Sequence, residues 1–106
     1  MHPDELDSMA DNLATDIRAI PGYMTDHEAR HLAMLVACTK GTGEILEIGS
    51  FMGKSTVLLS RAAERAQGNP KIVAVDPLTQ PSETDPSIPN HRCSRGDFYS
   101  NLKKAG

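Results

Sequence analysis

The residue types best suited to chemistry lie in one short stretch, residues 47–56, where a β-prone run gives way to a helical one. Gly49 and Gly53 let the backbone turn tightly and approach a ligand that a Cβ would exclude. The helix expected after Gly53 offers unpaired N–H groups and the positive end of its dipole, which suit a carboxylate or a phosphate. This stretch therefore predicts a turn that binds an anionic part of a ligand.

Two phosphate-binding patterns fit the turn only in part. A P-loop has the form G-x-x-x-x-G-K-S/T, and Gly53, Lys54 and Ser55 supply its end, but Ile48 stands where the first glycine belongs. The dinucleotide-binding pattern G-x-G-x-x-G lacks its middle glycine here. A P-loop-like phosphate-binding protein therefore stays open as an alternative.

Two amphipathic helices are expected before the turn. Residues 5–20 carry apolar side chains at spacings of three and four, and Pro21 ends this helix. Thr25 and Glu28 have the S/T-x-x-E form of a capping box, so a second helix begins there. These helices make up an N-terminal helical segment, residues 1–40.

A βαβ unit is expected next. Residues 44–48 form a β-prone run, residues 54–67 have the spacing of a helix, and residues 71–75 are nearly all apolar, which is typical of a parallel strand covered on both faces. Strand, helix and strand fit within about 32 residues, the size of such a unit. The fold class is therefore α/β. Four prolines between residues 77 and 89 predict a long loop, and a last helix begins near Asp97.

The turn and the residue after the second strand together resemble a known family. Glu47, Gly49 and Gly53 have the form E-x-G-x-x-x-G after a first strand, and Asp76 follows the second strand directly. This combination resembles class I S-adenosylmethionine-dependent methyltransferases. It is most similar to the branch of catechol-type and macrolide-sugar O-methyltransferases, in which a serine opens the helix after the second glycine, as Ser55 does here.

The resemblance implies that residues 41–106 are the N-terminal portion of a Rossmann-like methyltransferase fold, with S-adenosylmethionine as the methyl donor and a small-molecule hydroxyl as the acceptor. Asp76 would accept hydrogen bonds from both ribose hydroxyls, a geometry suited to a carboxylate. Glu47 would orient the turn or meet the cofactor's ammonium group. The methionine carboxylate would meet the Ser55 hydroxyl and the backbone N–H groups around the turn, which comprises Gly49, Ser50, Phe51 and Gly53.

The resemblance also implies what this chain does not supply. Divalent-metal dependence is known in that branch, but its metal carboxylates come from later strands of the sheet. A divalent metal is therefore expected only in a full-length protein, and neither a metal ligand nor a catalytic residue is assigned here.

Other polar residues have simpler structural explanations. His27 and His31 stand at the i, i+4 spacing of a metal pair, but a third ligand is missing, which favours a solvated helix face. His91 and Cys93 fall in the proline-rich loop and are interpreted as incidental loop residues. Cys38 stands among aliphatic residues and is interpreted as a buried small hydrophobe.

Composition and charge limit the class of protein. The chain has 106 residues, a formal net charge of −3, 4% aromatic residues and no Trp, which indicates one small domain with an aliphatic core. The mild acidity disfavours a nucleic-acid partner, and no apolar run reaches the roughly 20 residues of a membrane span. Two cysteines are too few for a disulfide framework, so a reduced, cytoplasmic protein is expected.

The length becomes informative once the resemblance is considered. The family has a seven-stranded sheet, whereas two clear strands are visible here, and residue 106 stands where a third strand should begin. We therefore expect the cofactor-binding half of a larger enzyme, truncated at its C-terminal end and inactive alone. Its open sheet edges would be covered by missing sequence, by a homo-oligomer or by a domain-swapped dimer. A non-catalytic fragment that self-assembles or binds the cofactor weakly is the alternative.

Overall fold

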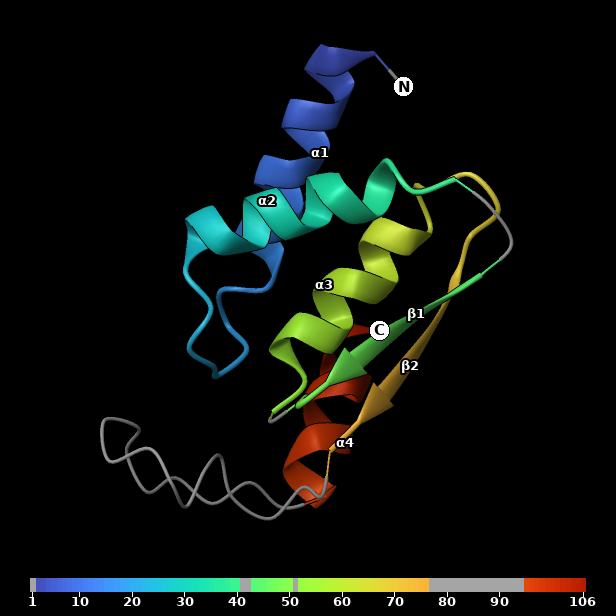
Figure 1. Ribbon diagram of the computed structural model, residues 1–106. Helices are drawn as coiled ribbons and strands as arrows, with labels where there is room; N and C mark the ends of the chain where they lie inside the picture. The colour runs from blue at the N-terminus through green and yellow to red at the C-terminus, as the bar shows by residue number, and fades with distance from the viewer. Residues whose placement is uncertain (1, 41–42, 51, 77–94) are drawn as a thin grey trace.

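The computed structural model describes residues 2–40, 43–50, 52–76 and 95–106, and these ranges form a mixed α/β protein (Figure 1). The predicted α/β class is thereby confirmed. The predicted proline-rich loop, with His91 and Cys93, lies outside the described residues. In chain order the elements are α1 (Pro3–Asp16), α2 (Asp26–Ala37), β1 (Glu44–Ile48), α3 (Lys54–Ala63), β2 (Lys71–Val75) and α4 (Arg95–Ala105).

The two strands form a parallel pair. Glu44 pairs with Lys71 at one end and Ile48 with Val75 at the other, and both strands have the bounds that the sequence predicts. Parallel neighbours need a crossover connection between them, and α3 supplies it. The predicted βαβ unit is therefore confirmed.

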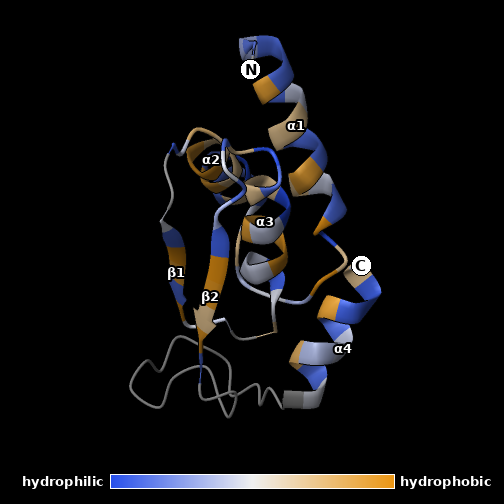
Figure 2. Cartoon of the chain, turned by 90° about the vertical axis from the view of Figure 1, so that its right-hand side faces the viewer, coloured by the Kyte–Doolittle hydropathy of each residue, from blue (hydrophilic) through white to orange (hydrophobic). Residues whose placement is uncertain are grey.

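The core lies between the helices and the inner face of the strand pair. Figure 2 shows the helices on one side of β1 and β2. Ile17 after α1 and Leu58 of α3 are the largest fully buried side chains, and Ile45 and Ile72 pack on the same core from the strands. Because α1, α2 and α3 share this one core, the N-terminal helical segment and the βαβ unit form a single packed body. The buried members are Met9, Ala10, Leu13, Ala14, Ile17, Ala29, Ala33, Val36, Val57, Leu58, Leu59, Ala62 and Ala63.

The outer face of the strand pair is open, which corrects one prediction. Leu46, Ile48 and Val75 are 62%, 81% and 54% exposed, although the apolar run at residues 71–75 predicts a strand covered on both faces. Side chains alternate along a strand, so the helices on one side can bury only every second residue. Within the described residues nothing covers the other side.

Helices α1 and α2 begin at hydrogen-bonded caps. The Thr25 hydroxyl accepts from the Glu28 N–H at 3.1 Å and donates to the Glu28 carboxylate at 3.0 Å, so the predicted start of α2 is confirmed. Helix α1 begins at Pro3, two residues before the predicted start at residue 5. The imidazole of His2 accepts from the Asp4 N–H at 3.2 Å, a cap that the apolar spacing could not reveal because it lies outside the periodic stretch.

Two helices end four residues before their predicted ends. Helix α1 ends at Asp16 and α3 at Ala63, although the apolar spacing continues to residues 20 and 67. Beyond both ends the backbone changes to tighter bonds of the i to i+3 type, such as Ile20 N–H to Ile17 O at 3.0 Å. Such a turn still buries an apolar side chain, and this explains why periodicity alone overestimates the helix length.

Ion pairs join α2 to α1 and to the segment that connects the two helices. The Arg30 guanidinium donates to Asp7 at 2.6 Å and to Asp11 at 2.7 Å, and Arg18 pairs with Asp26 at 2.7 Å. The hydrogen bond from Arg18, together with its charge, holds the pKa of Asp26 below the ordinary 3.8. These pairs lie on the surface, where water and salt screen the charges, so each contributes little to stability.

Candidate cofactor site

The structure brings the glycine turn and Asp76 together at the carboxyl ends of β1 and β2. The Gly49 N–H donates to Val75 O at 2.8 Å, which continues the strand pairing by one residue. The Ser50 N–H then donates to Asp76 Oδ2 at 2.6 Å, across 26 residues of sequence. Ligands of open parallel sheets bind at the carboxyl ends of the strands. Phe51, also predicted for the site, lies outside the described residues.

Both predicted glycines have a backbone conformation that other residues rarely adopt. Gly49 has φ +84° and Gly53 has φ +90°, and the left-handed region costs an L-residue about 1–2 kcal/mol. The Gly53 N–H donates to Ser50 O at 2.8 Å and closes the turn, while Gly53 O accepts from the Val57 N–H at 2.9 Å and starts α3. Gly53 is thus the residue at which the turn becomes a helix.

The two glycines differ in what lies beside them. A Cβ added to Gly49 would meet no atom within 4 Å among the described residues, so a ligand has room to approach the backbone there. A Cβ on Gly53 would lie 2.5 Å from Leu102 Cδ1 and 3.3 Å from Phe98 Cδ2. The missing side chain of Gly53 therefore makes room for α4, a role that the motif does not indicate. A cofactor contact at Gly53 stays a prediction.

The start of α3 is suited to an anion. Its cap is Gly53, which has no side chain to bond the first-turn N–H groups, and its first turn contains no acidic residue. A helix leaves these N–H groups without intrahelical partners, and they carry the positive end of the dipole. Ser55 lies half-buried in this turn, beside the groups it is predicted to assist.

Lys54 is placed differently from what the P-loop alternative needs. Its side chain lies along Gly22, where an added Cβ would be 3.0 Å from Lys54 Cδ. It therefore packs on the connection between α1 and α2, whereas a P-loop lysine must reach the phosphates. This position disfavours the P-loop interpretation.

Glu47 is a buried carboxylate with one oxygen left over. The side chain is 8% exposed, and the Thr56 hydroxyl donates to its Oε1 through a short hydrogen bond. Oε2 has no hydrogen-bond partner among the described residues. A buried acceptor without a donor costs about 1–3 kcal/mol, so a donor brought by a ligand would be favourable here. The sequence indicates Thr56 only as a residue at the start of a helix. It does not reveal the hydrogen bond to Glu47, because Glu47 stands nine residues earlier in β1.

The remaining polar candidates that the structure describes do not come together in a second site. The rings of His27 and His31 lie edge to face with centroids 4.4 Å apart, and within the described ranges no three potential metal ligands come together. Cys38 follows α2 and is exposed, so its predicted burial is wrong. It follows the last turn of the helix, where the apolar side chains before it no longer determine which way it faces. No helix in the described part of the chain has the length and apolarity needed to span a membrane.

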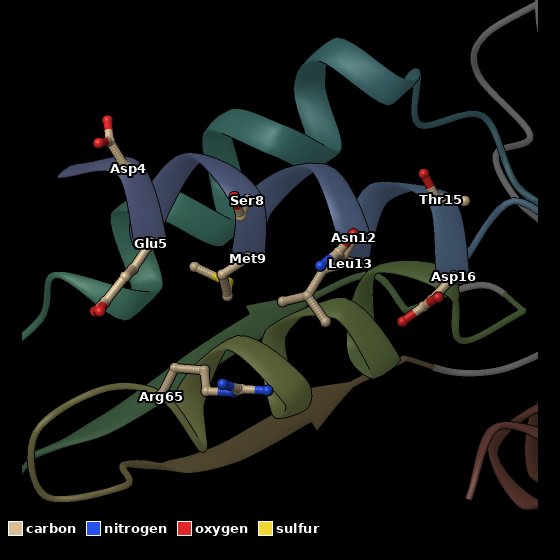
Figure 3. A pocket seen from close by; sticks show the side chains of 9 residues that line it. All are labelled: Asp4, Glu5, Ser8, Met9, Asn12, Leu13, Thr15, Asp16 and Arg65. Carbon is tan, nitrogen blue, oxygen red and sulfur yellow. The ribbon is translucent and has the colours of Figure 1, made fainter. Parts of the chain in front are cut away.

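A broad groove lies away from the turn. Figure 3 shows this groove of about 700 Å³, with one face of α1 along it and Arg65, just beyond α3, reaching toward it. Its lining combines the acidic residues Asp4, Glu5 and Asp16 with the apolar residues Met9 and Leu13. The groove is broad and open, and none of the described interactions points to a ligand in it.

No family model matches the chain, and no curated protein matches it. The motif and the geometry of the site therefore carry the functional inference.

Proposed function

We propose that this chain binds S-adenosylmethionine at the edge formed by the glycine turn, Glu47 and Asp76. In this proposal it is the cofactor-binding part of a Rossmann-like O-methyltransferase that acts in the cytoplasm on a small molecule. The observation that carries the proposal is the hydrogen bond between the Ser50 N–H and Asp76, because it joins the motif's turn to its acid beside the open backbone of Gly49.

The hydrogen-bond donors and acceptors at this site fit the chemical groups of this cofactor. A carboxylate has about four acceptor positions, so the hydrogen bond from Ser50 does not by itself prevent Asp76 from accepting from ribose hydroxyls. The uncapped first turn of α3, with Ser55, suits the methionine carboxylate. The leftover Oε2 of Glu47 suits the ammonium group, directly or through a water molecule.

Positioning is the chemical task that these residues can perform. S-adenosylmethionine supplies a sulfonium methyl group, which is transferred by in-line displacement to a nucleophilic oxygen. The chain's part is to hold both ends of the cofactor, and fixed orientation of this kind accounts for much of the rate of such a reaction. The acceptor hydroxyl is inferred from the family resemblance, and no catalytic residue or metal ligand is assigned.

Calorimetric titration of the 106-residue chain with S-adenosylhomocysteine, and separately with ATP, tests the proposal. We expect S-adenosylhomocysteine to bind and ATP not to bind. Binding of ATP alone would refute the proposal and favour a phosphate-binding protein. Binding of neither would also refute the proposal, and sedimentation of the same sample would then test the alternative of a fragment that self-assembles.

Variants of Asp76 test the role of the acid. Asp76→Ala should weaken S-adenosylhomocysteine binding by about tenfold or more, because one or two charge-assisted bonds of about 1.5–3 kcal/mol each are lost. Asp76→Asn keeps an oxygen for the Ser50 N–H and should also bind weakly, because the charge is gone. Glu44→Ala, at the far end of β1 where the side chain is exposed, is the matched control and should leave the affinity unchanged. Equal affinities of all three variants and the wild type would exclude the ribose-binding role.

A further inference from the structure

One face of α4 lies against the glycine turn. Phe98, Asn101 and Leu102 stand at the spacing that places side chains on one side of a helix. Phe98 is buried, and together with Leu102 it occupies the space beside Gly53. Asn101 Nδ2 donates to Met52 O at 2.9 Å, across 49 residues of sequence.

The hydrogen bond from Asn101 completes the fixing of one peptide unit. The C=O of Met52 and the N–H of Gly53 belong to the same planar unit. Asn101 holds the C=O, and Ser50 O accepts from the N–H at 2.8 Å. With both of its polar groups bonded, the plane of this unit cannot rotate freely. Its orientation sets the φ of Gly53, and therefore the direction in which the first N–H groups of α3 point.

A second contact holds α4 far from the turn. The Arg61 guanidinium donates to Ala105 O at the C-terminal end of α4 and also lies 3.6 Å from Asp16. Arg61 belongs to α3, but at the opposite end from Gly53. Replacing Arg61 therefore weakens the packing of α4 without touching the turn, whereas replacing Asn101 removes a contact with the turn itself.

We propose that Asn101 is a positioning residue of the cofactor site, which orients the peptide unit between Met52 and Gly53 and thereby aims the start of α3 at the anionic end of the ligand. This inference rests on the proposed function for the identity of the ligand. The orientation of the peptide unit itself is independent of that identity.

The first test compares Asn101→Ala with Arg61→Ala by calorimetry with S-adenosylhomocysteine and by thermal unfolding. Asn101→Ala should weaken binding about three- to tenfold, the equivalent of one lost hydrogen bond. Arg61→Ala loosens α4 at its other end, so it should lower the melting temperature at least as much but change the affinity less than twofold. Unchanged affinity in Asn101→Ala, or an equal loss of affinity in both variants, would overturn the positioning role.

The second test uses amide hydrogen exchange of the ligand-free chain. In Asn101→Ala the Gly53 N–H, bonded to Ser50 O, should exchange faster, whereas the Gly49 N–H, bonded to Val75 O, should not change. Asn101→Asp, which has the same size but no donor when ionised, should behave like Asn101→Ala. Unchanged exchange at Gly53 would overturn the inference. If the wild type binds no S-adenosylhomocysteine while exchange at Gly53 still rises, the proposed function fails but the control of the turn by Asn101 is upheld.

Discussion

Replacement of each turn glycine by alanine separates backbone strain from packing. Gly49 and Gly53 have nearly the same φ, +84° and +90°, but only Gly53 has another helix beside it. Gly49→Ala therefore adds a methyl group in open space, and Gly53→Ala adds one against Leu102 and Phe98. The pair forms a matched comparison in which the conformational cost is shared.

The expected losses follow from these two terms. The left-handed conformation costs alanine about 1–2 kcal/mol at either position. At Gly53 the added Cβ would lie 2.5 Å from Leu102 Cδ1, which is too close, and overpacking of this kind costs about a further 1–3 kcal/mol. Leu102 Cδ1 is the end of a flexible side chain, so Leu102 can rotate away, and this relief gives the lower limit of the packing cost. Phe98 Cδ2, at 3.3 Å, restricts the space into which Leu102 can move, and this restriction gives the upper limit of the packing cost. Gly53→Ala should therefore lower the free energy of unfolding by about 2–5 kcal/mol.

Urea unfolding followed by far-UV circular dichroism measures both variants, and Leu102→Ala completes a double-mutant cycle. In the Leu102→Ala background the contact with Cδ1 is absent and the tight approach of Phe98 remains, so the cost of Gly53→Ala should fall toward the conformational term that Gly49→Ala shows. Small domains are marginally stable, and Gly53→Ala alone is expected to be close to unfolding. Trimethylamine N-oxide in all samples then restores a measurable transition.

Two results would refute this reasoning. Equal losses for Gly49→Ala and Gly53→Ala would mean that α4 does not restrict the space beside Gly53. A Gly53→Ala cost that is the same with and without Leu102 would mean that the contact partner is wrong. Either result would also weaken the argument that α4 sets the turn.

Two further predictions concern the N-terminal helices. Thr25→Ala removes the cap of α2 and should lower the free energy of unfolding by about 1 kcal/mol in urea titrations, whereas Thr15→Ala, which removes a hydroxyl bonded only to the carbonyl of Asp11 one turn earlier, should have a smaller effect. The pKa of Asp26 is held below 3.8 in the folded chain by the hydrogen bond from Arg18, so its contribution to stability is present above that value and is lost as the pH falls through the lowered pKa. The melting temperature of Asp26→Asn should accordingly fall below that of the wild type at pH 6 and converge with it as the pH falls through the lowered pKa, and a difference that does not change with pH would contradict the assignment.

Local patterns predict most of the elements because each depends on neighbours in sequence. The short, nearly all-apolar run of residues 71–75 is enough to bound β2, and the Thr25 cap is enough to start α2. Helix ends are less predictable, since Ile20 and Ala66 keep their apolar contacts in a tighter turn beyond the α-helix. The burial of Cys38 and of both faces of β2 was predicted wrongly for a related reason. Apolar composition indicates what can be buried, while only the packed helices decide what is covered.

For the candidate site, the sequence by itself determined the turn, its glycines and the acid after β2, because the freedom of glycine to turn tightly and the end of a parallel strand are local consequences of residue type and order. Only the tertiary structure decided that Ser50 bonds Asp76, that Thr56 leaves one oxygen of Glu47 unpaired, and that Gly53 faces α4. It also added Asn101, which no motif indicates. The physical reason is distance along the chain: these contacts join residues 9 to 49 positions apart, and such contacts form only when the helices pack on the strands.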